Sequence, residues 1–231
     1  MSLPFTIFDR GVRWLGGGMF VAALAYCVWW YCFVLARPDG PLDWRVLAYD
    51  FALFGAFALH HSVFARDSVK ARLARVMPPA LVRSVYVWIA SGLLIAVCAL
   101  WRPTGGELYD VNGWRAYVHA AVQLAGVALI ASSTRVIDAL ILAGIRQPAL
   151  EGTLQITGPY RWVRHPIYLG WVVASFGAAH MTVTRFAFAV ISSFYLVVAV
   201  RWEERSLARE FPVRYAEYAR RVKWRLAPYI Y

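Results

Sequence analysis

Residues 14–36 read WLGGGMFVAALAYCVWWYCFVLA and contain no charged side chain over 23 positions. A helix rises 1.5 Å per residue, so this stretch is long enough to cross about 30 Å of hydrocarbon. Three further stretches, residues 46–65, 84–101 and 116–134, are almost as long and carry one charged residue between them, Asp50. The four stretches predict four transmembrane helices.

Two shorter uncharged runs follow, at residues 166–180 and 186–200, and only Met181-Thr-Val-Thr-Arg185 separates them. They predict a helical hairpin over residues 166–200 whose two arms each rise about 22 Å. A basic cytosolic tail follows. We therefore expect an all-α fold, a polytopic membrane helix bundle forming a single domain over residues 1–231, with the functional motifs in residues 152–231.

The composition supports a membrane protein. Of 231 residues, 61% are hydrophobic and 16% are charged, whereas soluble domains have about 45–50% and 25%. The first run exceeds the apolar core of a signal peptide, so we expect it to stay attached. The three cysteines lie inside apolar runs, which excludes a disulfide framework or a thiolate metal site, and we expect no metal.

The basic residues predict the orientation. With helices at these positions, 19 of the 24 Lys and Arg residues fall on one side of the membrane. The positive-inside rule then places both termini and the connection at residues 135–165 in the cytoplasm, and a bacterial inner membrane is the expected location. We interpret the net charge of +11 as a feature that sets the membrane topology and attracts anionic membrane lipid, and not as a sign of nucleic-acid binding.

Polar residues concentrate in the last third of the chain. The stretch Gly158-Pro-Tyr-Arg-Trp-Val-Arg-His-Pro-Ile-Tyr168 runs from a turn into an apolar helix that can begin at Pro166, with His165 at the cap. The free N–H groups of that helix start, beside Arg161 and Arg164, predict a site for a carboxylate or phosphate. Alternatively, the two arginines only reach lipid headgroups.

A second polar motif, Glu203-Glu204, ends the hairpin. Because a hairpin brings its ends together, we expect this pair beside Arg164 and His165. Adjacent carboxylates at a membrane surface need cationic partners. One interpretation is an ordinary salt bridge between loop and tail. The other is a pocket with cations for a carboxylate and carboxylates for an ammonium or ribose hydroxyls, as an amino-acid nucleoside requires.

These motifs resemble a known superfamily. The stretch Gly158–Gly170, followed by Glu203-Glu204, Leu207, Phe211, Tyr215, Tyr218 and Val222, is similar to the integral-membrane isoprenylcysteine carboxyl methyltransferases and phospholipid methyltransferases. The resemblance covers roughly residues 150–225. It implies an S-adenosylmethionine-dependent methyltransferase.

The resemblance also implies functional residues. Those expected to line the cofactor are Gly152, Thr153, Leu154, Gln155, Tyr160, His165, Pro166, Ile167, Tyr168 and Glu203. Those expected to act in catalysis are His165, Arg164 and Glu204. Candidates for a base that deprotonates an acceptor are His165 and Glu204 and, further from the motif, His61 and Asp138.

Shorter matches in the front half resemble the methanethiol S-methyltransferase branch of the superfamily. They include His61–Arg66, Arg83–Val87 and Trp101-Arg102-Pro103. Prenylcysteine enzymes also carry a substrate-contacting Arg four residues before the first Glu, where this chain has Ala199. The resemblance therefore implies methylation of a small or lipophilic acceptor, and the best candidate is S-methylation of a thiol such as methanethiol.

Other functions stay open on the sequence alone. Within the superfamily, the acceptor could be the carboxyl group of a prenylated cysteine or the amine of a phospholipid. A protein of another class, a non-catalytic membrane subunit with the same fold, would keep the helices without binding the cofactor. A transporter is disfavoured because the sequence shows no pair of interrupted helices in matching halves. The residues predict no oligomeric state.

Overall fold

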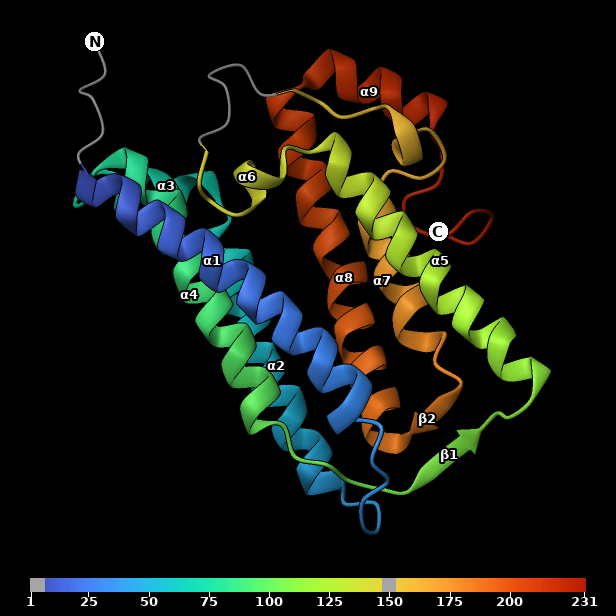
Figure 1. Cartoon of the computed structure of the whole chain (residues 1–231). Helices are drawn as coiled ribbons and strands as arrows, with labels where there is room; N and C mark the ends of the chain where they lie inside the picture. The colour runs from blue at the N-terminus through green and yellow to red at the C-terminus, as the bar shows by residue number, and fades with distance from the viewer. Residues whose placement is uncertain (1–6, 147–152) are drawn as a thin grey trace. The chain divides into compact units, whose positions relative to one another are not determined.

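The computed structural model describes residues 7–146 and 153–231, which form mainly helices together with two short strands and connecting loops (Figure 1). In chain order the elements are α1 (Ile7–Trp29), η1 (Trp30–Val34), α2 (Trp44–Phe64), α3 (Asp67–Leu73), α4 (Pro79–Leu100), β1 (Glu107–Asp110), α5 (Trp114–Val136), α6 (Ala139–Leu142), η2 (Gly158–Arg161), α7 (Pro166–Phe176), β2 (His180–Thr182), α8 (Val183–Glu210) and α9 (Pro212–Arg221).

Five helical stretches in the described residues are long and apolar enough to cross a membrane. They are Asp9–Val34, Trp44–Phe64, Leu81–Leu100, Trp114–Val136 and Val183–Glu210. The first four coincide, within a few residues at each end, with the four predicted spans. The all-α bundle is therefore confirmed, with the pair of strands as a small addition.

The contacts divide the chain into two compact units, which are described one at a time. Within the described residues, the first comprises 7–35, 44–102 and 139–146. In it α1 packs along α4 and α2 also packs on α4 (Figure 1). Trp30 and Trp101 meet edge to face with their ring centroids 5.8 Å apart. The prediction that the whole chain is one domain stays a prediction.

The one charged residue within the predicted spans, Asp50, is fully buried in the first unit. Its Oδ1 accepts a hydrogen bond of 3.0 Å from the Arg102 main-chain N–H. This contact ties the first half of α2 to Arg102, the second residue after the end of α4. Asp50 therefore helps to fix one end of this helix group, a structural role.

Within the described residues, the second unit comprises 36–43, 103–138 and 153–231. Its helices α5 and α7 lie side by side (Figure 1) because two glycines face each other. A Cβ atom on Gly126 would lie 2.5 Å from the Ala174 nitrogen, and one on Gly170 would lie 2.7 Å from the Gly126 oxygen. Small residues allow this close approach of membrane helices.

The predicted helical hairpin is present as α7 and α8, but its two arms differ in length, whereas the sequence predicts equal arms. Helix α7 has only 11 residues and ends at Phe176, so it rises about 16 Å. Helix α8 has 28 residues and does not end at Val200 but continues to Glu210. The charged residues after Val200 are good helix formers, and the first strong helix breaker is Pro212.

The segment between the two helices differs as well. The sequence predicts a tight connection at Met181–Arg185, whereas His180–Thr182 form strand β2, which pairs antiparallel with β1. Thr182 then caps α8, because its side chain accepts a hydrogen bond of 3.1 Å from the Arg185 N–H. Residues 177–182 thus connect the end of the short helix α7 to the start of α8.

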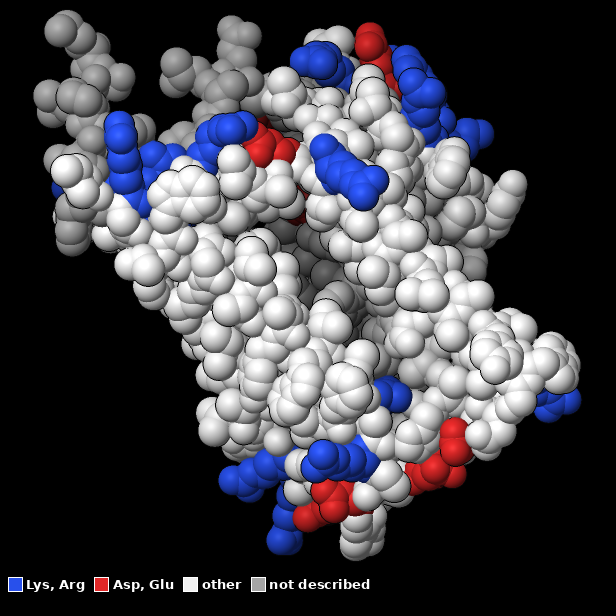
Figure 2. Space-filling view, in the orientation of Figure 1, with Lys and Arg blue, Asp and Glu red and all other residues white. Residues whose placement is uncertain are grey.

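Charged side chains of the second unit gather at its ends. On the face drawn in Figure 2, basic side chains cluster over α9, whereas uncharged ones cover α5 between its two ends. Helix α9 carries Arg214, Arg220 and Arg221. This distribution suits a helix group whose middle lies in hydrocarbon and whose end at α9 lies in the headgroup region.

Candidate active site

The site begins where the chain enters α7. Gly158 has a φ of +57°, a left-handed conformation that glycine adopts at little cost, and it starts the short helix η2. Pro166 is the first residue of α7 and His165 is its N-cap, as predicted. Pro166 loses no hydrogen bond at this position. Arg164 and His165 are thereby held at the start of the helix.

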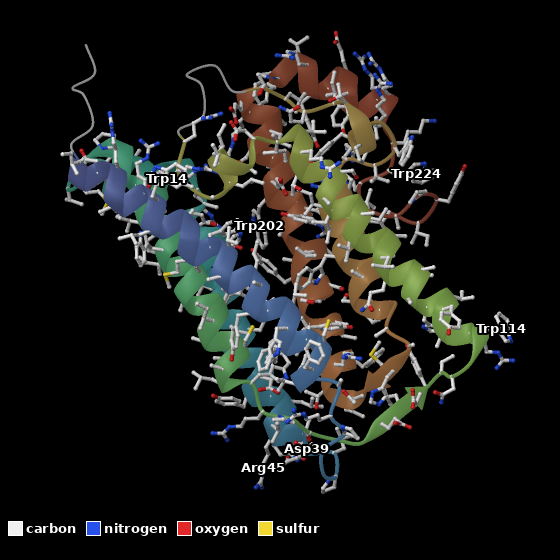
Figure 3. All side chains as sticks on the ribbon, in the orientation of Figure 1. Trp14, Asp39, Arg45, Trp114, Trp202 and Trp224 are labelled. Atoms are coloured by element: carbon white, nitrogen blue, oxygen red, sulfur yellow. The ribbon has the colours of Figure 1, made fainter. Side chains whose placement is uncertain are left out.

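The end of α8 supplies the carboxylates. Since α8 continues to Glu210, Glu203 and Glu204 are helical residues and their side chains leave the axis about 100° apart. The two therefore meet different partners. Figure 3 labels Trp202, which precedes this pair, and Trp224. Trp224 precedes Arg225, which belongs to the tail after α9, the third segment that contributes to the site.

Glu204 is held on both oxygens. Its Oε1 accepts from Arg164 Nε at 2.7 Å and its Oε2 accepts from Arg225 Nε at 2.9 Å. The Glu204 side chain is 12% exposed and that of Arg164 is 9% exposed. Arg164 also donates to the Val222 carbonyl at 3.0 Å. The predicted proximity of Glu204 to Arg164 is confirmed.

Glu203 is the more accessible carboxylate, with 46% of its side chain exposed. Its Oε2 accepts from the Tyr168 hydroxyl at 2.8 Å and lies 3.4 Å from His165 Nδ1. The rings of His165 and Tyr168 stack with their centroids 5.5 Å apart. Glu203 therefore has a fixed orientation while part of its surface stays open to a ligand.

His165 lies between the two carboxylates. Its ring is buried, and Nε2 lies 3.5 Å from Glu204 Oε1 without the geometry of a hydrogen bond. Burial alone lowers the pKa of an imidazole, but the contacts with Glu203 and Glu204 outweigh it and raise the pKa of His165 above its usual value. The ring is thus favoured as a cation that balances the pair.

Buried tyrosines form the wall behind these charges. Tyr218 donates a hydrogen bond of 2.8 Å to the Tyr160 carbonyl, and burial raises its pKa to about 12. The Tyr215 hydroxyl is buried and has no hydrogen-bond partner among the described residues. Burial, and then the charge of Glu204, raise the pKa of Tyr215. These hydroxyls therefore stay protonated.

The predicted cofactor strip lies only partly beside the charges. Gly152 falls outside the described residues. Thr153 and Gln155 contact each other through their side chains at 3.2 Å. Leu154 is buried in an apolar cluster with Tyr215, Tyr218 and Val222. Pro166 is buried in the first turn of α7, and Ile167 is half-buried in that turn.

The other two base candidates belong to other segments of the chain. His61 is part of the first unit, where its Nδ1 lies 2.9 Å from the Tyr86 hydroxyl. Asp138 stands between α5 and α6. Of the four candidates, His165 and Glu204 are the two that belong to the charged cluster.

Sequence reasoning missed Arg225. It lies 21 positions after Glu204 in the tail, where it is one of eight basic residues from Arg201 onward. The only signal in the sequence was that buried carboxylates require more than one cation. Nothing in the spacing distinguishes Arg225 from its basic neighbours.

Residues 141–209 match the isoprenylcysteine carboxyl methyltransferase family. Across a longer part of the chain, the protein is 36% identical over 179 residues to methanethiol S-methyltransferase 2 of Bradyrhizobium diazoefficiens. This match covers 74% of this chain and 69% of the relative. It is 35% identical to methanethiol S-methyltransferase of Mycobacterium tuberculosis, covering 81% and 79%. It is 34% identical to the enzyme of the same name from Crocosphaera subtropica, covering 80% and 75%. No solved structure matches the chain.

Proposed function

Because the chain belongs to the isoprenylcysteine carboxyl methyltransferase family, we propose that it transfers a methyl group from S-adenosylmethionine to the sulfur of methanethiol. The protein is an integral membrane methyltransferase, and a methyltransferase requires a methyl donor. The identity of the donor, S-adenosylmethionine, and that of the acceptor, methanethiol, are our proposals. The choice of acceptor rests on the activity for which the relatives are named, methanethiol S-methylation.

One observation carries the proposal. The family match, residues 141–209, contains the start of α7 and nearly all of α8. There the structure brings His165, Arg164 and Tyr168 together with Glu203 and Glu204. Perturbed ionisable groups that gather in one place are typical of functional sites.

The residues present fit S-adenosylmethionine. Its amino-acid end carries an ammonium and a carboxylate, and its ribose carries hydroxyls. Glu203, which is partly exposed, can accept from the ammonium or a hydroxyl. Buried polar atoms without a hydrogen-bond partner among the described residues, His165 Nε2 and the Tyr215 hydroxyl, remain for further contacts. Tyr160 and Leu154 supply apolar surface nearby.

When bound, S-adenosylmethionine would supply an electrophilic methyl group on a positively charged sulfur. The residues of the chain would orient it. Tyr168 holds the Glu203 carboxylate through its hydroxyl, and Arg164 and Arg225 hold Glu204. Fixed geometry of this kind contributes to catalysis by aligning the reacting atoms. An anionic nucleophile and a cationic donor lose charge as they react, which a water-poor site favours.

In this proposal, no residue of the charged cluster has to remove the proton of the thiol. The contacts with Glu203 and Glu204 raise the pKa of His165, which makes the ring a weaker proton acceptor at its two nitrogens, and Glu204 is occupied by two guanidinium groups. The reactive form of the acceptor is the thiolate. We therefore expect the methyl-transfer rate to rise with pH as the thiolate fraction of methanethiol in solution increases.

Ala199 favours a small thiol over a prenylated cysteine. It lies one helical turn before Glu203 on α8, where the prenylcysteine enzymes that the chain resembles carry an arginine. A charge-assisted hydrogen bond contributes about 1.5–3 kcal/mol, which is about a 10- to 100-fold difference in affinity. Introducing Ala199→Arg should raise activity on a farnesylcysteine analogue without improving methylation of methanethiol.

The test uses purified wild-type protein with radiolabelled S-adenosylmethionine and three acceptors in parallel, methanethiol, a farnesylcysteine analogue and phosphatidylethanolamine. We expect label in a volatile product with methanethiol. Transfer only to the analogue or the lipid amine would overturn the acceptor and leave the methyltransferase assignment intact. Binding of the cofactor with no transfer at all would favour a non-catalytic subunit.

We also propose that the site and both termini face the cytoplasm of a bacterial inner membrane, since 19 of 24 basic residues lie on the side predicted to be inside. Epitope tags at the two termini should be protected from protease in sealed right-side-out vesicles. A tag at the carboxyl end that is cleaved there would contradict this orientation.

A further inference from the structure

The tail that follows α9 is fixed beside the site by its main chain. The Arg164 N–H donates to the Trp224 carbonyl and the His165 N–H donates to the Arg225 carbonyl, each at 2.9 Å. Arg164 Nη1 donates in addition to the Val222 carbonyl at 3.0 Å. The two residues just before α7 are therefore held by residues 222–225.

Resting on the proposed function, we propose that Arg225 is a positioning residue for methyl transfer. It fixes Glu204, and with it Arg164, so that Glu203 and His165 keep the orientation that receives the methyl donor. Arg225 reaches the ligand only through these neighbours.

The argument starts from the two oxygens of Glu204. Arg164 occupies Oε1 at 2.7 Å and Arg225 occupies Oε2 at 2.9 Å, so the carboxylate is held from two sides. The terminal torsion of a glutamate is otherwise broad. Without Arg225, the carboxylate of Glu204 can rotate toward His165 Nε2, which lies 3.5 Å from Oε1. That rotation would draw His165 away from Glu203.

Arg225 is itself held in place before it contacts Glu204. Its N–H donates to the Tyr231 carbonyl at 2.9 Å and its own carbonyl accepts from His165. Its guanidinium lies 5.3 Å from the centroid of the Tyr231 ring, and the next residue, Leu226, is buried. Two main-chain hydrogen bonds thus fix the backbone of Arg225, and one ring contact fixes its guanidinium group.

The exposure of Arg225 separates positioning from stability. Its side chain is 40% exposed, and ion pairs with an exposed partner contribute little to folding. A variant that keeps the main chain should therefore fold. Lys223 provides a matched control, because it is an exposed cation two positions earlier in the same tail.

The experiment uses the full chain in detergent or lipid nanodiscs with the variants Arg225→Gln, Arg225→Lys and Lys223→Gln. It measures binding of radiolabelled S-adenosylmethionine, methyl transfer to methanethiol and the melting temperature. We expect Arg225→Gln to lower cofactor affinity about tenfold, as for one charged hydrogen bond. Arg225→Lys should recover part of the loss because it keeps the charge without the planar guanidinium. Lys223→Gln should match the wild type.

A double-mutant cycle distinguishes positioning from a general structural effect. If Arg225 acts through Glu204, then in the Glu204→Gln background the Arg225→Gln substitution should change affinity less than about twofold. Should Arg225→Gln not fold, Arg225→Lys takes its place in the cycle, with an expected single-variant loss of about threefold.

Two results would overturn the inference. One is wild-type affinity in a folded Arg225→Gln protein, and the other is a tenfold loss that is undiminished in the Glu204→Gln background. If the wild type binds S-adenosylmethionine normally while either of these results is found, the proposed function is unaffected. A wild-type protein that binds no S-adenosylmethionine would instead overturn the proposed function, and this inference with it.

Discussion

The two ends of α8 both bury polar residues, yet they differ in how those residues are paired. At the beginning, Thr184 exchanges hydrogen bonds with the main chain of Thr104, accepting from its N–H at 2.8 Å and donating to its carbonyl at 2.9 Å. Arg185 donates to the His180 carbonyl. At the far end, Glu203 and Glu204 meet three cationic side chains and one carboxylate remains half exposed.

The difference indicates which end is built for a ligand. Small hydroxyls paired with main-chain groups satisfy one another, so the beginning of α8 is a structural joint with the strand pair β1–β2. Several ionisable groups gathered in one place, with one carboxylate partly open to the surroundings, are typical of a binding site. The predictions that follow test this contrast, from the largest effect to the smallest.

Removing the buried guanidinium of Arg164 should have the largest effect. Arg164→Met leaves Glu204 with Arg225 and the more distant His165 ring, and it removes the hydrogen bond to Val222. Breaking a buried ion pair costs about 3–5 kcal/mol, so methyl transfer should fall at least about 100-fold. Arg164→Lys retains the charge as a control. A folded Arg164→Met protein with normal turnover would show that this end of α8 is only a salt bridge.

Neutralising the exposed carboxylate should affect binding more than folding. Glu203→Gln, and separately His165→Ala, should each weaken S-adenosylmethionine binding by about 1–3 kcal/mol, measured by equilibrium binding. The melting temperature should change little for Glu203→Gln, since its side chain is 46% exposed. Unchanged affinity in both variants would assign the two residues to structure.

The beginning of α8 should show the reverse pattern. Thr184→Val removes both hydrogen bonds to Thr104, which should lower stability by about 1–3 kcal/mol while cofactor affinity stays at the wild-type value. Thr134→Val is the matched control, because that hydroxyl donates within its own helix, to the Ile130 and Ala131 carbonyls. If Thr184→Val lost cofactor affinity without losing stability, the contrast between the two ends would be wrong.

The smallest expected effect is a dependence on pH. His165 has a raised pKa in the folded protein, so its charge stabilises the fold fully below its usual pKa of about 6.5. That contribution disappears as the pH rises through the raised value. The difference in melting temperature between wild type and His165→Gln should therefore be largest at acid pH and shrink toward alkaline pH. A difference that grows with pH would show that the ring is neutral in the fold.

The sequence predicted the long helices and the meeting of the two motifs. Uncharged runs locate membrane helices because hydrocarbon excludes charge, and Pro166 marks a helix start whatever the surroundings. The proximity of Glu204 to Arg164 needed only that α7 and α8 return to the same end. These inferences depend on local composition and on one topological step.

The remaining features depend on long-range contacts. Counting uncharged residues ended the last helix at Val200, although the backbone stays helical until Phe211 and Pro212. The short α7 and strand β2 follow from the pairing of His180–Thr182 with β1, about 70 positions away. Arg225 was hidden because only the fold of the tail selects it from among the basic residues there.

The most direct measurement is the recovery of label from S-adenosylmethionine in volatile product, with methanethiol as acceptor, for wild type, Glu203→Gln and Thr184→Val at a temperature where all three are folded. The account predicts labelled dimethyl sulfide from the wild type and from Thr184→Val, and a yield reduced about 10-fold or more for Glu203→Gln. Equal yields from Glu203→Gln and the wild type would contradict the assignment of the site to the end of α8.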